Sequence, residues 1–110
     1  MKHKLTFGRD IQALLRKLIL RREEYFSNDK LNTEGRKIFE ETARMLIHEH
    51  PYFKPIVKRA RRTGSLKDVL RIAELVLGRR EVKKLILSIQ LTPYRETIDY
   101  EIENKLGNFS

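Results

Sequence analysis

Basic side chains are the residues of this chain best suited to do chemistry, and most of them lie between residues 54 and 84. This stretch carries eleven Lys and Arg against three acids, Asp68, Glu74 and Glu81, so its local charge of +8 supplies nearly all of the chain's net charge of +9. Apolar residues keep a helical spacing through the stretch, which predicts folded helices rather than a disordered basic tail. A helix-borne excess of positive charge predicts binding to DNA, to RNA or to an acidic protein partner. The candidate binding residues are Lys54, Lys58, Arg59, Arg61, Arg62, Lys67, Arg71, Arg79, Arg80, Lys83 and Lys84.

The alternative interpretation of these cations is structural. Cations in the last turn of a helix complement its dipole, as Arg61 and Arg62 would do before Gly64. A structural ion-pair network would need a matching number of acids, and this stretch supplies only three. Tyr52 and Phe53 are the only aromatic residues nearby, and either could belong to a core, so stacking on single-stranded bases is not indicated. We therefore favour a binding surface.

The histidines are the next candidates, and their spacing argues against a metal site. His48 and His50 flank Glu49, and side chains two residues apart point to different faces of a helix, so they cannot chelate one ion as an i, i+4 pair does. Their position before Pro51, near a helix C-terminus, favours a structural role. The chain has no cysteine and no glycine-rich phosphate-binding motif. We predict a non-enzymatic protein with no cofactor, no metal and no small-molecule substrate.

The composition is that of a globular protein. With 110 residues, 40 % of them hydrophobic and 35 % charged, the chain should form a single helical domain over residues 1–110. A Lys-, Arg- and Glu-rich sequence without cysteine is common in cytosolic proteins of thermophiles. The apolar runs are too short for a signal peptide or a membrane span, so we expect no membrane partner. The expected location is the cytoplasm, in association with the nucleoid if the protein binds DNA.

The apolar spacing predicts an all-α fold of about five helices in a compact bundle, with no strand. The first helix extends over residues 11–26 and ends at the turn-forming segment SNDKLN. A second helix begins near Thr33, which can cap it, and stops before Pro51. A short third helix covers residues 54–62 and ends at Gly64, a residue suited to a left-handed stop.

The fourth helix is expected to be long and central. Ser65 can cap it, with Asp68 three residues later as in a capping box. Apolar residues over positions 66–89 cover more than one face, and we expect the helix to continue through Gly78, straight or bent, although glycine costs about 1 kcal/mol there relative to Ala. Thr92 and the proline after it open a last helix, whose apolar stripe is Tyr94, Ile98, Ile102 and Leu106.

Apolar residues around more than one face of the long helix predict a protein that is not a monomer, because monomers rarely expose large apolar patches. The expected interface joins this helix to the last one. The last helix also reverses the sign of the charge, since residues 95–110 contain four acids against two cations. It could therefore dock on the basic surface of another copy, or shield that surface within its own chain. The candidate interface residues are Leu77, Val82, Ile98 and Ile102.

The order of features in the second half resembles the α-helical domain of GINS subunits, the helicase accessory proteins of archaeal and eukaryotic DNA replication. The similarity covers LKDVLRIAELVLGRREVKKLILSI and QLTPYRETIDYEIENKL, where Arg80 and Lys84 fill the basic positions of a long helix. The segments RREE and KLNTEGRKIFEETARMLI are similar in order to the first two helices of the family. Two departures are the Tyr94-Arg95 pair, which displaces the family's Glu to Glu96, and the lack of the family's small β-domain.

The resemblance implies a heteromeric subunit, without a cofactor, that bridges a ring helicase to a RecJ-like partner. Our leading hypothesis is accordingly a non-enzymatic helical subunit of a DNA-replication or other nucleic-acid-processing complex. A stand-alone basic DNA- or RNA-binding protein or regulator is the first alternative, and a self-assembling structural or coat protein is the second. A bridging subunit should expose a sizeable apolar face and bind bare DNA weakly, whereas a direct binder should show steeply salt-dependent binding.

Overall fold

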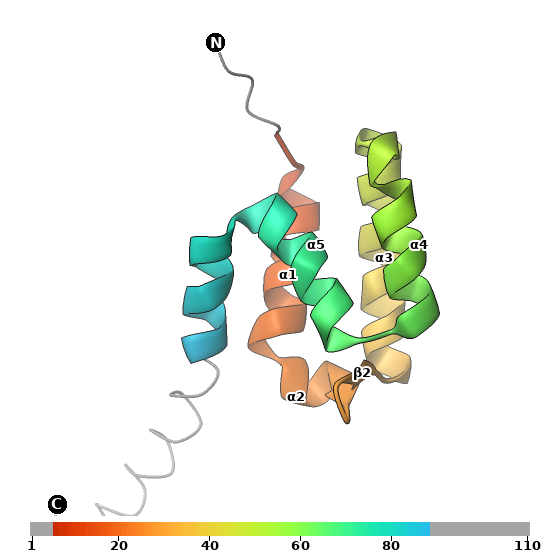
Figure 1. The fold of residues 1–110 in the computed structure, drawn as a ribbon. Coiled ribbons are helices and arrows are strands. Elements are labelled where there is room, and N and C mark those ends of the chain that lie inside the picture. The colour runs from red at the N-terminus through yellow and green to blue at the C-terminus, as the bar shows by residue number, and fades with distance from the viewer. Residues whose placement is uncertain (1–5, 89–110) are drawn as a thin grey trace, which may run out of the picture.

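The computed structural model describes residues 6–88, and it confirms the all-α class (Figure 1). Helices contain 82 % of the described residues, and the sole sheet of this region is a two-stranded hairpin. The elements in chain order are α1 (Arg9–Leu20), α2 (Arg22–Tyr25), β1 (Phe26–Ser27), β2 (Lys30–Leu31), α3 (Thr33–Glu49), the 3-10 turn η1 (Pro51–Phe53), α4 (Lys54–Thr63), α5 (Leu66–Leu77) and a helix over residues 79–88.

The predicted first helix is divided in two and is shorter than expected. The backbone of Arg21 leaves the helical region with φ −115° and ψ 36°, and Phe26 begins a strand. The turn Asn28–Asp29, at φ 53° and 63°, closes an antiparallel hairpin that pairs Phe26 with Leu31. Such strands are too short to produce a readable alternation in the sequence, which explains why no strand was expected. The prediction of a turn in SNDKLN is confirmed.

Asn32 rather than Thr33 caps α3, since its side chain accepts a hydrogen bond from the N–H of Gly35 at 2.8 Å. Asn32 has the extended backbone that an N-cap requires, and Thr33 is the first helical residue. The expected cap is therefore wrong by one position. The helix ends at Glu49, just before Pro51, as predicted.

The junction between α4 and α5 agrees with the sequence. Gly64 adopts the left-handed conformation, φ 63° and ψ 13°, and ends α4. The Ser65 hydroxyl then accepts a hydrogen bond from the N–H of Asp68 at 3.1 Å and caps α5. The hairpin packs onto this junction, because the N–H of Leu31 donates to the Gly64 carbonyl at 2.8 Å.

The long central helix is contradicted by the structure. α5 ends at Leu77, and Gly78 has φ 98° and ψ 147°, a conformation far from helical that favours glycine strongly. The chain changes direction there, and the helix 79–88 lies beside α1 (Figure 1). The last helix predicted after Thr92 lies outside the described residues.

The buried side chains form one apolar cluster to which α1, α3, α4, α5 and the helix 79–88 all contribute. Within residues 6–88, no helix combines the length and the apolar character needed to cross a membrane. The largest fully buried residues of the cluster are Phe39, Ile11, Leu15, Leu18, Ile19, Leu46, Ile72, Val57, Val69 and Val82.

Candidate nucleic-acid interface

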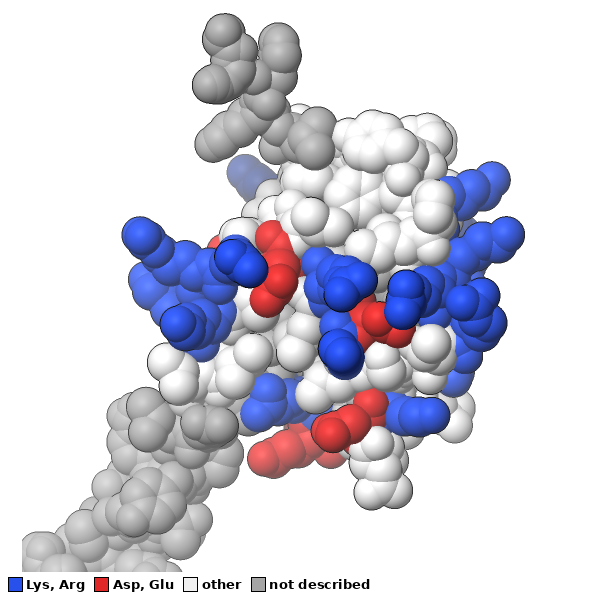
Figure 2. Space-filling view, in the orientation of Figure 1, with Lys and Arg blue, Asp and Glu red and all other residues white. Residues whose placement is uncertain are grey.

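Ten of the eleven predicted binding residues are exposed, and we call them the basic band. Figure 2 shows Lys and Arg side chains across one face of the molecule, over the helix 79–88, α5 and α4, with few acidic side chains between them. α4 presents its cations outward because Val57 and Ala60 turn its other side into the core. The members of the basic band are Lys54, Lys58, Arg59, Arg62, Lys67, Arg71, Arg79, Arg80, Lys83 and Lys84.

Arg61 is the predicted binding residue that the structure places elsewhere. Its guanidinium Nε donates to both carboxylate oxygens of Glu40, at 3.1 and 2.9 Å, and so ties α4 to α3. The hydrogen bonds to Glu40 raise the pKa of Arg61. Arg61 is thus half-buried and held by two hydrogen bonds to Glu40, and we leave it out of the basic band.

Two of the three acids in residues 54–84, Asp68 and Glu81, form hydrogen bonds with other side chains. The carboxylate of Asp68 is nearly buried, and the Thr63 hydroxyl donates to it at 2.6 Å. The Arg59 guanidinium lies 3.8 Å from the same carboxylate. The Thr63 hydrogen bond lowers the pKa of Asp68 against the effect of burial, and the nearby cations Arg59 and Arg71 add to this lowering. Glu74 remains exposed.

Glu81 positions the last part of the basic band. Arg16 of α1 donates to its carboxylate from Nε at 2.5 Å and from Nη2 at 3.3 Å. This pair lowers the pKa of Glu81 and raises that of Arg16, in each case mainly through the hydrogen bonds. The contact joins the helix 79–88 to α1. Sequence reasoning missed Arg16, and no local signal could have found it, because 65 residues separate the partners.

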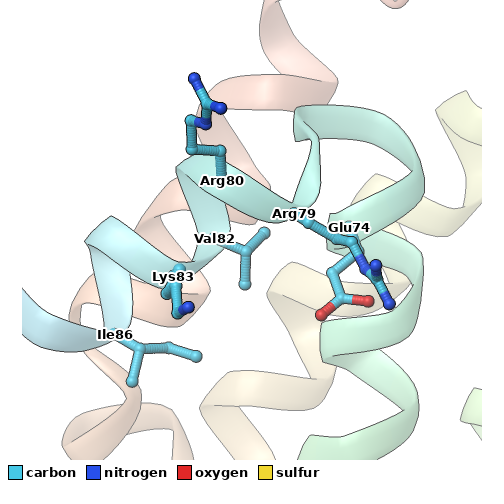
Figure 3. Close-up of a pocket in the computed structure, with 6 residues that line it drawn as sticks. All are labelled: Glu74, Arg79, Arg80, Val82, Lys83 and Ile86. Atoms are coloured by element: carbon cyan, nitrogen blue, oxygen red, sulfur yellow. The ribbon is translucent and has the colours of Figure 1, made fainter.

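An open hollow lies in the angle between α5 and the helix 79–88 (Figure 3). Val82 and Ile86 point from the helix toward α5, and Arg79 extends toward Glu74. The hollow therefore combines an apolar floor with a rim that carries more positive than negative charge. Its lining residues are Glu74, Arg79, Arg80, Val82, Lys83 and Ile86.

His48 and His50 lie in different environments. His50 follows α3, and its ring nitrogens lie 2.8 Å from the Thr6 carbonyl oxygen and 3.1 Å from the Tyr52 hydroxyl. The ring also packs against Phe7 at 4.6 Å between centroids. His48 is exposed on α3. In the part of the chain described, no three His, Asp or Glu side chains are grouped as metal ligands would be.

The predicted interface residues differ in burial, and two of them lie outside the described residues. Val82 is 1 % exposed and belongs to the core, so its assignment to an outer apolar face is wrong. The break at Gly78 causes this, because it turns Val82 toward α5 and into the core cluster. Leu77 is half-buried against the core, and Ile98 and Ile102 lie outside the described residues. Among residues 6–88 the exposed large apolar side chains are instead Leu20, Tyr52, Leu75 and Leu87.

Comparison of the chain with protein-family models, with curated proteins and with solved structures gave no match, so the functional argument rests on the surface described above.

Proposed function

We propose that this protein is a non-enzymatic helical module that binds nucleic acid through the phosphate backbone. The observation that carries the proposal is the basic band: its ten cations are exposed on three helices, and Lys and Arg side chains gather over these helices on one face of the molecule (Figure 2). Lys and Arg that meet phosphates release condensed counterions, and this release supplies most of the affinity of sequence-independent binding. The cations are carried by helices that pack on one apolar core, so the backbone of this surface is already folded before nucleic acid binds.

Duplex nucleic acid fits the basic band better than a single strand does. Single-strand binding surfaces combine cations with aromatic platforms on which bases stack. Within residues 6–88, Tyr52 is the sole exposed aromatic side chain, and Phe53 beside it is buried. Charges without stacking platforms suit the regular phosphate rows of a duplex.

The proposal is tested by the salt dependence of binding to a fluorescently labelled duplex. The variant Lys58→Gln/Arg62→Gln removes two exposed charges that lie one turn apart on α4. If both meet phosphates, the slope of log K against log salt should become shallower by about 1.8, at about 0.9 per phosphate. The melting temperature should stay nearly the same, because exposed surface charges contribute little to stability.

The matched control is Lys37→Gln/Arg44→Gln, which removes the same charge from exposed positions on α3. This control should lower affinity slightly through the net charge and leave the slope nearly unchanged. Equal effects of the two double variants would contradict a specific role for the basic band. Binding of the wild type that does not depend on salt would contradict the phosphate contact itself.

A second candidate function is that of a bridging subunit in a replication complex similar to GINS. The observation in its favour is that Leu75 and Leu87 are 55 % and 51 % exposed on two of the helices that carry the basic band. Apolar side chains at such positions suit contact with another protein. A bridging subunit would bind the bare duplex weakly and would lose partner binding when both leucines are made polar.

A further inference from the structure

The hollow between α5 and the helix 79–88 has a lining that phosphate alone does not match. Arg79 and Lys83 supply positive charge at its rim, Arg80 lines it with a side chain that points away from the floor, and Val82 and Ile86 supply the apolar floor (Figure 3). A phosphodiester can neutralise the cations but offers nothing to cover Ile86. A segment in which carboxylates alternate with apolar side chains would satisfy both parts of the lining.

Such a segment occurs in this chain. Residues 96–103 read ETIDYEIE, with acids at four positions and with Ile98, Tyr100 and Ile102 between them. We propose that residues 96–103 dock in the hollow of the same chain and compete there with nucleic acid for part of the basic band. The docking stands on the composition of the two surfaces, whereas the competition rests on the proposed function.

The length of the connection permits docking within one chain. Seven residues lie between Ser88 and Glu96, and an extended connection over these eight steps reaches about 26 Å. The hollow begins nine residues before Ser88 on the same helix, which corresponds to about 14 Å along the axis. A short connection also gives the segment an effective concentration of about a millimolar near the hollow. Weak contacts are therefore sufficient to keep the hollow occupied when no competitor is present.

Carbodiimide crosslinking of the full chain, without nucleic acid, tests the docking. This reagent joins a lysine amine directly to a carboxylate that contacts it. We expect a link between Lys83 and one of the acids in residues 96–103, found by mass spectrometry in the monomer band. Lys37 and Glu34 provide an internal positive control, because Nζ lies 3.4 Å from Oε2.

Two variants separate docking in the hollow from general attraction between opposite charges. Lys83→Arg keeps the charge but removes the amine, so the Lys83 link should disappear while the control link remains. Ile98→Ser/Ile102→Ser keeps every acid but removes apolar groups, and it should lower the yield of the link at least about threefold if the floor of the hollow contributes. An unchanged yield in this double variant would overturn the hollow as the binding site.

The same experiment decides which molecule supplies the segment. A link found only in the dimer band would place the segment of a second copy in the hollow and overturn docking within one chain. Absence of the Lys83 link while the control link forms would overturn the docking altogether.

Duplex binding tests the competition separately. The tail-neutral variant replaces the four acids at positions 96, 99, 101 and 103 by Gln or Asn. Its matched control replaces the exposed Glu23, Glu24, Glu34 and Glu41 by Gln, which changes the net charge equally. A competitor near its dissociation constant lowers apparent affinity by a few-fold, so the tail-neutral variant should bind duplex about threefold more tightly than this control. Equal affinities together with a positive crosslink would overturn the competition and leave the docking in place. Failure of every form to bind duplex would instead contradict the proposed function.

Discussion

At the scale of single residues, Asp68 is a nearly buried group through which pH should act on stability. Its carboxylate is nearly buried at the start of α5, where it accepts a hydrogen bond from the Thr63 hydroxyl. The backbone N–H of Ser65 donates to the Thr63 hydroxyl oxygen at 3.2 Å, and the Ser65 hydroxyl accepts from the N–H of Asp68, so the three residues join the two helices in one network. The network holds the pKa of Asp68 below its ordinary value of 3.8. A carboxylate with a lowered pKa in the folded state stabilises the protein wherever it is ionised.

Replacement of Asp68 by Asn should therefore destabilise the protein in a pH-dependent way. At pH 7 we expect a loss of about 1–3 kcal/mol in the free energy of unfolding, because a charge-assisted hydrogen bond is lost in a nearly buried site. The contribution of the ionised group is fully present above pH 3.8 and disappears as the pH falls through the lower, folded-state pKa. Urea unfolding at pH 7 and near pH 3 measures the difference. The control is Glu34→Gln, which removes an exposed carboxylate and should change the free energy of unfolding little at either pH. A loss that is the same at both pH values would contradict the role given to the charge.

The hairpin turn contains a second testable residue, Asp29. It adopts φ 63°, a left-handed conformation that is unfavourable for residues with a Cβ atom. Its carbonyl accepts a hydrogen bond from the N–H of Leu66 at 2.8 Å, and this contact does not depend on the side chain. Asp29→Gly should therefore raise the free energy of unfolding by about 0.5–1 kcal/mol. Thermal unfolding checks this, with Ser27→Gly, in the strand, expected to lower stability. A lower stability of Asp29→Gly would assign a contribution to the carboxylate.

At the scale of elements, Gly78 decides where the helix 79–88 lies. Its φ of 98° and ψ of 147° end α5 and direct the next helix to α1. The Arg16–Glu81 pair and the buried Val82 then hold that helix against the core. The position of four cations of the basic band thus depends on one glycine.

Two variants, Gly78→Asn and Gly64→Asn, test this role by comparison. Gly64 lies in the left-handed region, which Asn tolerates, and the nearest atom to a new Cβ is the flexible end of Arg36. Gly78 has open space around it, so any cost of a side chain there comes from the backbone. We expect Gly78→Asn to cost about 1–3 kcal/mol and Gly64→Asn clearly less, measured by urea unfolding. A gain in helix content by circular dichroism without a loss of stability in Gly78→Asn would show that α5 can continue through this position.

At the scale of the whole molecule, we predict self-association through Leu75 and Leu87 rather than through Leu77 and Val82. The break at Gly78 buries Val82 and half-buries Leu77, so the apolar face expected on a long helix is reduced. Leu75 and Leu87 are the exposed apolar side chains that remain on α5 and the helix 79–88. They are the described residues best placed to contact a second copy or another subunit.

If these leucines form an interface, sedimentation velocity should show species larger than the 13.2 kDa monomer. The protein concentration for this test is on the order of tens of micromolar. Leu75→Glu/Leu87→Glu should return the protein to a monomer with little change in melting temperature, since both side chains are more than half exposed. The variant Ser27→Glu/Thr33→Glu adds the same charge at other exposed positions and should leave association unchanged. A monomeric wild type over this range would contradict the prediction and favour the stand-alone duplex binder.

The sequence alone was sufficient for the features that depend on neighbouring residues. Pro51 ends α3 because a proline lacks the N–H that a helix interior needs. Gly64 ends α4, and Ser65 caps α5, through hydrogen bonds that span three or four residues. The charge of the basic band is likewise a property of composition, and α4 exposes its cations because its apolar residues are spaced to face inward.

The tertiary structure alone decided which side chains meet across long separations in the chain. Arg61 was expected in the binding surface, and its partner Glu40 lies 21 residues away in another helix. Glu81 finds Arg16 only because Gly78 directs the helix 79–88 to α1. Glycine is compatible both with a bent helix and with a sharp break, and the choice between them depends on where Val82 can be buried. Local propensity differs by only about 1 kcal/mol at such a position, whereas burial of an aliphatic side chain is worth about 1.5–3 kcal/mol, so packing determined the outcome.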